Sequence, residues 1–311
     1  MSDDKMSYEN DLITKIAWKY YIEGLTQNEI SESLNLSRMK VIKYLEKAKA
    51  NHVIQFRIDL EKINYQELQQ EIKEKYQLKD IYIVPASNDT ESENFTLAAA
   101  QYIEDRITGD TLISIGYGEA VSKTLGHLRI STKYNVTFVS LSGGVKFYMP
   151  TAIDTRSDYY TNPNYKHYII PSPLMVSSEK LAKEMLAEKP IRNVLEMIPH
   201  SNMTIMGIGA LNDKATIVKE GYLNSMDIDI IKTQGAAGDM LSQFYDINGD
   251  LIDLDLHKQL ISSEIGILKS LNHVVAVAGG AHKREAIIGA LKGGYIDVLI
   301  TDEAAARGLV E

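Results

Sequence analysis

The sequence predicts a two-domain α/β protein, with an N-terminal winged helix-turn-helix and a C-terminal domain built on a mostly parallel sheet. Three observations support this prediction. The first 58 residues hold short amphipathic helices with clear cap residues, and the last of these helices is rich in Lys and Arg. From residue 80 onward, short apolar strands alternate with helical stretches, which is typical of a parallel sheet covered by helices. The length of 311 residues also fits about two domains.

The small domain begins with a helix predicted over residues 12–22, where apolar residues recur at helical spacing. Thr26 is a suitable N-cap for a second, short helix, and Glu29 stands three residues later, as a capping box requires. Asn35 can adopt the left-handed conformation of a tight turn, and Ser37 can cap a third helix. This order of a capped helix, a turn and a second capped helix predicts a helix-turn-helix.

The third helix is expected to turn Met39, Leu45 and either Val41 or Ile42 toward the core. The stretch VIQFRI that follows, residues 53–58, alternates like a strand and is predicted to form one arm of a wing. We therefore place a DNA-binding domain at residues 1–58 and an effector-binding and oligomerisation domain at residues 59–311.

The charge of the chain is unevenly distributed. The formal net charge is -9, yet residues 12–57 hold eight Lys and Arg against four Glu. A basic island on an acidic body indicates a local site for a polyanion, and the paired helix of this motif enters the DNA major groove by its N-terminal end. A three-helix bundle with a solvated cationic face is the structural alternative. The expected DNA contacts are Thr26, Gln27, Ser37, Arg38, Lys40 and Lys43.

A connecting helix is predicted within residues 58–79, either packed on the large domain or beginning a dimer contact. Beyond it, the pattern predicts βα units in turn. They are a strand at 81–85 and a helix at 95–107, a strand at 111–116 and a helix at 117–128, strands within 135–144 and 202–211, and strand-helix pairs within 273–291 and 296–310.

Four of the predicted strands end in glycine-rich turns. In open α/β sheets, ligands bind outside the carboxyl ends of the strands, where helix N-termini present N–H groups to an anion. Several such turns predict a site for a phosphate-bearing or hydroxyl-rich small molecule, although tight strand-to-helix packing also requires glycine. The candidate residues are Gly116, Tyr117, Gly118, Ser142, Gly143, Gly144, Gly207, Gly209, Gly279 and Gly280.

Two charged residues lie close to glycine turns. Lys283 follows Gly280 by three residues, and there its ammonium group can bind phosphate as a point charge. A solvated lysine is the alternative, which the helix dipole mildly disfavours. Asp239 follows Gly238 and can accept hydroxyl groups of a sugar, or it can cap a following helix.

Several classes of function are disfavoured by the sequence. The stretch GYGEAV lacks the third glycine of a dinucleotide fingerprint, and no Asp or Glu stands about 20 residues on, so no nicotinamide cofactor is expected. The seven His show no metal-ligand spacing, His282 is expected at the surface, and there are no cysteines, so neither a metal nor another cofactor is expected. No apolar run approaches the ~20 residues of a membrane span, and the polar N-terminus is no signal peptide. A cytoplasmic protein without membrane contact is expected.

Over nearly its full length the chain resembles the SorC-type bacterial transcriptional regulators. The resemblance rests on IAWKYYIEGLTQNEISESLNLSRMKVIKYLEKA, ISIGYGEA, VSLSGGV, MGIGAL, GAAGDMLSQFYDINGD and VAVAGGAHKREAIIGALKGGYIDVLITDEAAARGL. It implies a winged helix-turn-helix and an effector domain similar in fold to phosphosugar isomerases, in which catalysis is lost and a phosphorylated sugar acts as inducer. It also implies a homo-tetramer, or a dimer, whose affinity for double-stranded operator DNA falls when the effector binds.

Within this family the chain is similar to Lsr-type repressors, which respond to phosphorylated autoinducer-2, through IAWKYYIEGLTQ, IGYGEA and GAAGDML. The resemblance implies phosphate contacts at Gly116–Glu119, at Ser142–Gly144 and at Lys283, and hydroxyl contacts at Asp239 and Leu241. The expected effector is phosphorylated autoinducer-2 or another pentose, hexose or polyol phosphate. The alternative is an isomerase or deaminase of phosphosugars with an appended DNA-binding module, since Glu119 and Asp239 could supply its carboxylates.

Overall fold

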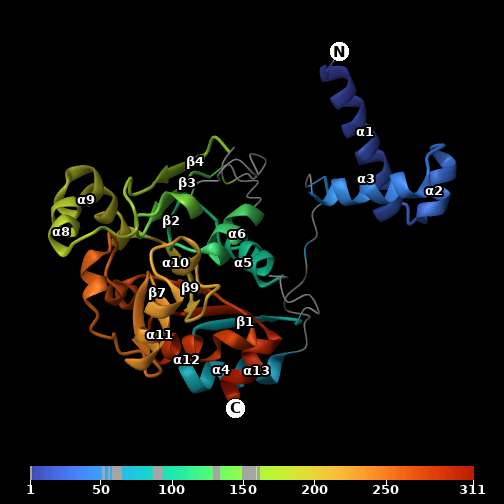
Figure 1. Ribbon diagram of the computed structural model, residues 1–311. Helices are drawn as coiled ribbons and strands as arrows, with labels where there is room; N and C mark the ends of the chain where they lie inside the picture. The colour runs from blue at the N-terminus through green and yellow to red at the C-terminus, as the bar shows by residue number, and fades with distance from the viewer. Residues whose placement is uncertain are drawn as a thin grey trace. The chain divides into compact units, whose positions relative to one another are not determined.

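The computed structural model contains two compact units, residues 1–58 and 59–311 (Figure 1). The residues whose structure is described are 2–50, 53–54, 57, 65–86, 94–128, 134–148, 159 and 162–311.

The small unit contains α1 (Ser2–Tyr21), α2 (Gln27–Ser33) and α3 (Arg38–Ala50). The predicted capping box is present, because Thr26 Oγ1 accepts the N–H of Glu29 at 3.3 Å and Glu29 Oε2 accepts the N–H of Thr26 at 2.8 Å. Asn35 has φ 52°, and Ser37 Oγ accepts the N–H of Lys40 at 3.3 Å. The turn and both caps therefore form as local sequence predicts. The three helices enclose a core that contains Ile16, Ile30, Val41 and Leu45.

Met39 does not belong to this core. Its side chain is 73% exposed, whereas Val41, Leu45 and Ala48 are buried. These three residues, at spacings of four and three, form the buried stripe of α3, and Met39 is two residues before it, on the opposite side of the helix. The prediction that Met39 faces inward is therefore wrong.

The predicted wing strand lies mostly outside the described residues. Val53, Ile54 and Arg57 are described and none of these three lies in a strand, while residues 55, 56 and 58 are not described.

The large unit is built on a seven-stranded sheet in which every pairing is parallel. The mixed α/β class with a mostly parallel sheet is thus confirmed. In spatial order the strands are β1 (Asp80–Val84), β10 (Val298–Asp302), β9 (Val274–Val277), β5 (Met203–Gly207), β2 (Thr111–Ile115), β3 (Val136–Ser140) and β4 (Tyr165–Tyr168).

Helices cover both faces of this sheet (Figure 1). Alternate residues of β9 enter different cores: Val275 and Val277 pack with the residues of one face, and Val274 and Ala276 with those of the other, as the two-residue period of a strand dictates. One face is covered by α5 (Asn94–Glu104) and α6 (Glu119–His127), and the other by α4 (Gln66–Tyr76), α12 (Arg284–Lys292), α13 (Glu303–Val310), α8 (Glu179–Ala187) and α9 (Lys189–Leu195).

The connecting helix α4 packs on the large unit, which is the first of the two predicted alternatives. Ile72 is fully buried. Lys75 Nζ and Tyr76 Oη both donate to the carbonyl oxygen of Leu309, at 2.8 and 3.0 Å. The early part of the predicted helix, residues 58–64, lies outside the described residues.

A second, antiparallel sheet stands beside the first and contains β6 (Gly209–Ala210), β7 (Ala236–Met240) and β8 (Gln243–Asp246). Asp239 therefore lies in a strand, and the alternative that it caps a helix is wrong. Two helices, α10 (Thr216–Lys219) and α11 (Ser225–Thr233), connect β6 to β7. Short 3-10 turns lie elsewhere in the connections: η2 (Val145–Phe147), η3 (Ile198–His200), η4 (Asp255–Gln259), η5 (Ile265–Ser270) and η6 (Ala281–Lys283).

The strand order reverses between β2 and β5. From β2 the chain continues outward to β3 and β4, and from β5 it continues in the opposite direction to β9 and β10. Such a switch point leaves a crevice at the carboxyl ends of the strands, where ligands bind in open α/β sheets. None of the helices in the described part of the chain has both the length and the apolar composition of a membrane span.

Candidate functional site

A cavity of about 720 Å³ opens at this switch point. It is lined from the main sheet by the segments after β2, β5, β9 and β10, and from the small sheet by the β7–β8 turn. The loop before α10 and α10 itself close another side. Most of the predicted effector residues are brought together here, namely Tyr117, Gly118, Glu119, Gly207, Gly209, Asp239, Leu241, Gly279, Gly280 and Lys283.

Gly116 does not line the cavity. Its N–H donates to the carbonyl oxygen of Ile205 at 2.8 Å, and a Cβ atom at this position would lie 2.6 Å from Met206 Sδ. Close packing against the Met206 side chain of β5 favours glycine here, which is the structural reading that the sequence left open.

The turn of Ser142, Gly143 and Gly144 also lies outside the cavity lining. The N–H groups of Gly143 and Gly144 donate to the carbonyl oxygens of Ile261 and Ser172, at 2.7 and 2.8 Å. Ser142 is fully buried and its hydroxyl group bonds that of Tyr148 at 2.9 Å. In this arrangement these groups bond to neighbouring loops and do not point donors into the cavity.

The β7–β8 turn brings strained backbone to the cavity. Leu241 and Ser242 have φ 55° and 61°, and they connect Met240 to its partner Gln243, as the two central residues of a type I′ hairpin do. A residue with a side chain costs roughly 1–2 kcal/mol in this conformation, and such strain tends to be retained at functional sites. Both residues line the cavity.

Asp239 is held directly beneath this turn. It pairs with Gly209 across the small sheet, and a Cβ atom on Gly209 would lie 1.9 Å from Asp239 Oδ1, so that a side chain at position 209 would displace the Asp239 carboxylate. Burial raises the pKa of Asp239 to about 6, although the charge of Lys283 and a hydrogen bond from the Ser242 N–H act in the opposite direction. The Lys283 ammonium group donates to the carbonyl oxygen of Ile208 at 2.9 Å.

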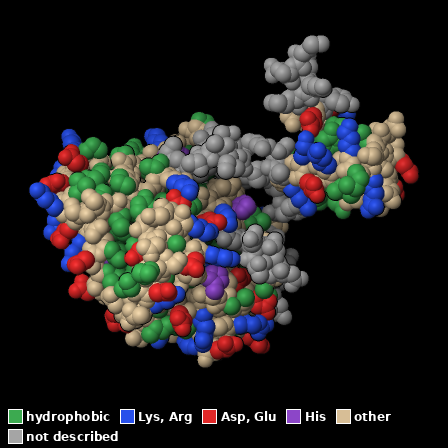
Figure 2. Space-filling model, in the orientation of Figure 1, with side chains coloured by type: hydrophobic (Ala, Val, Ile, Leu, Met, Phe, Trp, Pro, Cys, Tyr) green, Lys and Arg blue, Asp and Glu red, His purple; other side chains and the backbone are tan. Residues whose placement is uncertain are grey.

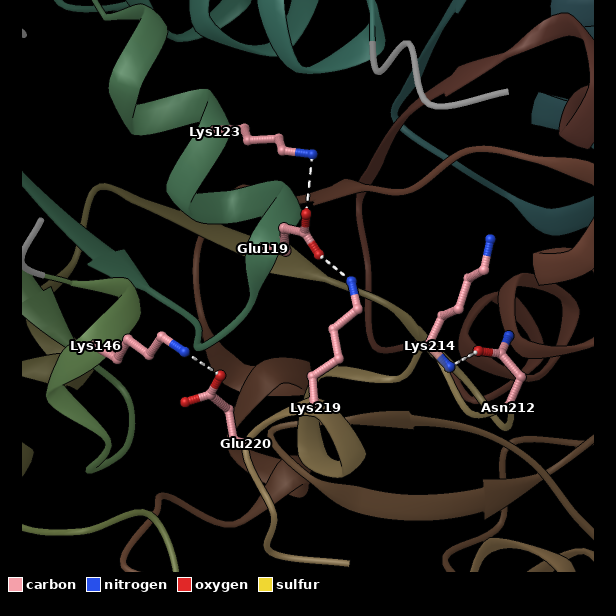
Figure 3. A network of polar contacts seen from close by, with 7 residues as sticks. All are labelled: Glu119, Lys123, Lys146, Asn212, Lys214, Lys219 and Glu220. Carbon is pink, nitrogen blue, oxygen red and sulfur yellow. Dashed lines mark hydrogen bonds and ion pairs between the residues drawn. The ribbon is translucent and has the colours of Figure 1, made fainter. Parts of the chain in front are cut away.

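Around Glu119, lysine residues that were not predicted from the sequence line the cavity (Figure 3). Glu119 accepts an ion pair from Lys123 at 3.0 Å and from Lys219 at 2.8 Å. The hydrogen bond from Lys219 is the largest of the effects that lower the pKa of Glu119 to about 2. Lys214 also lines the cavity, and its ammonium group forms no ion pair with any residue whose structure is described.

The sequence gives little indication that these lysines belong to the site. Lys123 stands four residues after Glu119, which is the spacing of an ion pair on a helix, and it could have been found. Lys214 and Lys219 lie about 100 residues away in a loop and a one-turn helix without any motif. Further residues in the lining are Asn212, Thr216, Asp302 and His282, and His282 is also exposed, as the prediction of a surface residue requires.

Two helices begin at the cavity without a side-chain cap. Asp302 caps α13 by accepting the N–H of Ala305 at 2.8 Å, but the N-cap residues of α6 and α12, Gly118 and Lys283, accept no such bond. The first N–H groups of a helix without a side-chain cap are unsatisfied and carry a partial positive charge. At α12 the N–H groups of Lys283 and Arg284 already donate to the carbonyl oxygens of Gly280 and Ala281, so the start of α6 is the better suited of the two helix ends to bind an anion.

The small unit presents the predicted DNA contacts at the start of α3. Arg38, Lys40 and Lys43 are exposed, and Arg38 Nε donates to Gln27 Oε1 at 3.4 Å, so that these two side chains are neighbours. The hydroxyl groups of Thr26 and Ser37 serve as helix caps. Lys47, further along α3, pairs with Glu9 of α1. The N-terminal end of α3 is thus cationic and accessible.

Comparisons with known proteins give the family. Residues 61–311 match the family model Sugar-bind, described as "Putative sugar-binding domain". The transcriptional regulator LsrR of Enterobacter sp. (strain 638) is 33% identical over 307 residues, which are 97% of this chain and 93% of the relative. The chain belongs to the SorC family of sugar-binding transcriptional regulators. The LsrR protein of Escherichia coli (strain K12) is also 33% identical, over 97% of this chain and 95% of its own.

Solved structures agree with this SorC-family fold. The full-length sorbitol operon regulator SorC from Klebsiella pneumoniae has a TM-score of 0.69 at 22% identity, over 97% of this chain and all of its own. A DeoR family transcriptional regulator from Listeria monocytogenes has a TM-score of 0.68 at 25% identity, over 78% of this chain and 98% of its own.

Acidic and basic side chains are interspersed over the face of the large unit that Figure 2 shows. Within the described ranges, no group of three or more His, Cys, Asp and Glu is placed to hold a metal ion.

Proposed function

We propose that this SorC-family regulator is a repressor whose operator binding falls when a phosphorylated sugar or sugar-like metabolite enters the cavity at the switch point. One observation supports this proposal above the others: donors for an anion and an acceptor for hydroxyl groups line the same cavity. The uncapped start of α6 and the side chain of Lys283 line the same cavity as Asp239. A volume of about 720 Å³ is also in the range of small-molecule sites.

The cavity suggests how such a ligand lies. Its phosphate would contact the start of α6 at Gly118 and the ammonium group of Lys283, while its hydroxyl groups would donate to Asp239 and reach the strained backbone at Leu241. Pentose, hexose and polyol phosphates and phosphorylated autoinducer-2 all combine these two chemistries, and the resemblance to Lsr-type repressors favours the last of them.

The small unit would bind operator DNA through the N-terminal end of α3. Arg38 can read guanine, and Lys40 and Lys43 can neutralise phosphates. Gln27 would orient Arg38 through their hydrogen bond. The exposed Met39 adds an apolar contact of the kind that reads a thymine methyl group.

A single module of this kind binds DNA weakly, and dimers place two recognition helices about 34–36 Å apart. The proposal therefore includes assembly as a homo-tetramer or dimer through the large unit. Because operator DNA is the partner, the proposed location is the cytoplasm.

One observation favours an isomerase as the alternative function. Asp239 has a pKa of about 6 beside a cation in the cavity, and a general base is most effective when its pKa lies near the working pH. Glu119 is a poor candidate, because a carboxylate with a pKa of about 2 is a weak base. Turnover of sugar phosphates by the purified protein distinguishes the two functions, and we expect none.

The test of the repressor is fluorescence anisotropy with a labelled fragment of the promoter, titrated with and without a panel of sugar phosphates. At least one of them should lower the affinity for DNA. Lys283→Ala should bind the fragment normally and lose this response, while the control Lys232→Ala, an exposed lysine of α11 outside the cavity lining, should keep it. A wild-type affinity that no phosphorylated compound changes would refute the proposal.

The DNA face has its own test in the same assay. Arg38→Ala and Lys40→Ala should each weaken binding, with a shallower salt dependence where the lost contact is a phosphate. Lys15→Ala is the control, because this lysine is an exposed residue of α1 paired with Asp11. Equal affinity of all three variants would exclude α3 as the recognition helix.

A further inference from the structure

We infer that Lys123, Lys214 and Lys219 form the anion subsite at the start of α6, and that the Glu119 carboxylate fills this subsite until the effector's anionic group displaces it. The inference rests on the proposed function, since it names the group with which an effector must compete. Glu119 then acts as an internal competitor in the free protein and not as a ligand contact.

The geometry at Glu119 is that of a bound anion (Figure 3). Its two carboxylate oxygens are divided between two ammonium groups, Oε1 with Lys123 at 3.0 Å and Oε2 with Lys219 at 2.8 Å. Glu119 is also the first residue of α6, where the helix dipole favours negative charge. A phosphate would find the same cations and the same helix end, with one more oxygen to place.

Three lysines surround the single carboxylate of Glu119, so this part of the cavity wall carries excess positive charge. Lys214 lines the same cavity and forms no ion pair with the described residues. Two further carboxylates in the lining are otherwise engaged, because Asp239 faces Lys283 and Asp302 caps α13. A ligand with a double negative charge therefore fits this wall better than the single charge of Glu119 does.

Displacement of Glu119 requires little energy. The side chains of Glu119, Lys123 and Lys219 are 38%, 42% and 46% exposed, and ion pairs with this degree of exposure contribute little to stability.

Displacement of Glu119 by the ligand would also affect α10. Lys219 is its last residue, and the next residue, Glu220, pairs with Lys146 of η2 at 2.6 Å. Ion pairs thus hold α10 to two segments that follow strands of the main sheet, and the pair with Glu119 is one of them. When an anion replaces Glu119, the same ligand holds α10 and the start of α6, so that ligand binding is transmitted to the segment of residues 211–220.

The test is binding of inorganic phosphate to the full chain, measured by isothermal titration calorimetry. Glu119→Gln removes the internal anion and should tighten phosphate binding by about three- to tenfold, as the loss of two partly exposed ion pairs predicts. Adding Lys219→Met in this background should abolish the gain. The matched control is Glu179→Gln, which changes the first residue of α8 and its ion pair with Lys183 and should leave phosphate binding unchanged.

Hydrogen exchange at α10 provides a second test. Hydrogen exchange in residues 211–220 should be faster in Glu119→Gln than in the wild type without phosphate, and phosphate should restore protection. Weaker phosphate binding by Glu119→Gln would show that Glu119 is a ligand contact, and unchanged binding would place the anion elsewhere. Either result overturns the inference.

These outcomes are separate from those of the proposed function. If Glu119→Gln binds phosphate more tightly but no sugar phosphate changes the affinity for DNA, the subsite stands and the repressor mechanism fails. If sugar phosphates release the DNA while Glu119→Gln shows no gain, the repressor stands and the internal competitor is refuted.

Discussion

Asp239→Asn should stabilise the large unit at neutral pH. Asp239 is wedged against Gly209 in the small sheet and is half-buried at the cavity, and burial disfavours its ionised form in the folded protein. Asparagine keeps the shape of the side chain and an oxygen that accepts the Ser242 N–H, but it carries no charge. The substitution therefore removes the desolvation cost and keeps the local hydrogen bond.

The size of the effect follows from the shift in pKa. An increase from 3.8 to about 6 corresponds to about 3 kcal/mol of unfavourable free energy when the group is ionised. Because Asp239 also lines the cavity, its water screens part of this cost, and we expect a gain of about 1–2 kcal/mol in the free energy of unfolding. For a unit of this size, that corresponds to an increase of about 2–8 °C in Tm.

The gain has a defined pH dependence. The folded pKa lies above the unfolded one, so the cost of ionisation is fully present above pH 6 and disappears as the pH falls toward 3.8. Denaturant unfolding of wild type and Asp239→Asn at pH 7 and pH 4 measures this directly. The difference should be present at pH 7 and vanish at pH 4, and Asp229→Asn, an exposed carboxylate of α11, should show no such difference.

Two results would refute this reasoning. If Asp239→Asn is less stable at pH 7, the ionised carboxylate stabilises the fold, and its attraction to Lys283 outweighs burial. If the difference is the same at both pH values, it arises from packing and not from charge.

Three further substitutions test other parts of the structure. Ser242→Gly should raise the free energy of unfolding by about 0.5–1 kcal/mol, because glycine adopts the left-handed conformation without strain, and a loss in denaturant unfolding would contradict the assigned strain. Thr26→Ala should lower the stability of the small unit by about 1 kcal/mol through loss of the capping box with Glu29, seen as faster hydrogen exchange in α2 with the large unit unchanged. His257→Gln should flatten the loss of stability between pH 6.5 and about 4, because burial lowers the pKa of His257 to about 4 and the folded protein resists its protonation, whereas an equal pH slope in both proteins would assign that loss to another group.

Features that depend on neighbouring residues could be predicted from the sequence. The Thr26 capping box joins residues three apart, and the turn at Asn35 needs only a residue that tolerates positive φ. The βα alternation likewise follows from local hydrophobic periods, and three of the four predicted glycine turns lie in the cavity lining. Lys283 and Asp239 could be selected because each stands beside such a turn.

Features that depend on packing between distant elements could not be predicted. Met39 faces outward because α1 and α2 contact the other side of α3. The Ser142–Gly144 turn resembles the other glycine turns in sequence, yet its N–H groups donate to Ile261 and to Ser172 from two later segments. Nothing in the pattern distinguishes this turn from those that line the cavity.

The sequence alone determined the caps of the small unit, the βα alternation of most of the main sheet, the class of sheet and the family, but not β4 or the small antiparallel sheet. Only the tertiary structure decided which glycine turns share a cavity, that Asp239 lies in a strand, and that Lys219 meets Glu119 across 100 residues. The physical reason is range: hydrogen-bonded caps and amphipathic periods act over a few residues, whereas an electrostatic site is assembled from strand ends whose neighbours are set by the topology of the sheet.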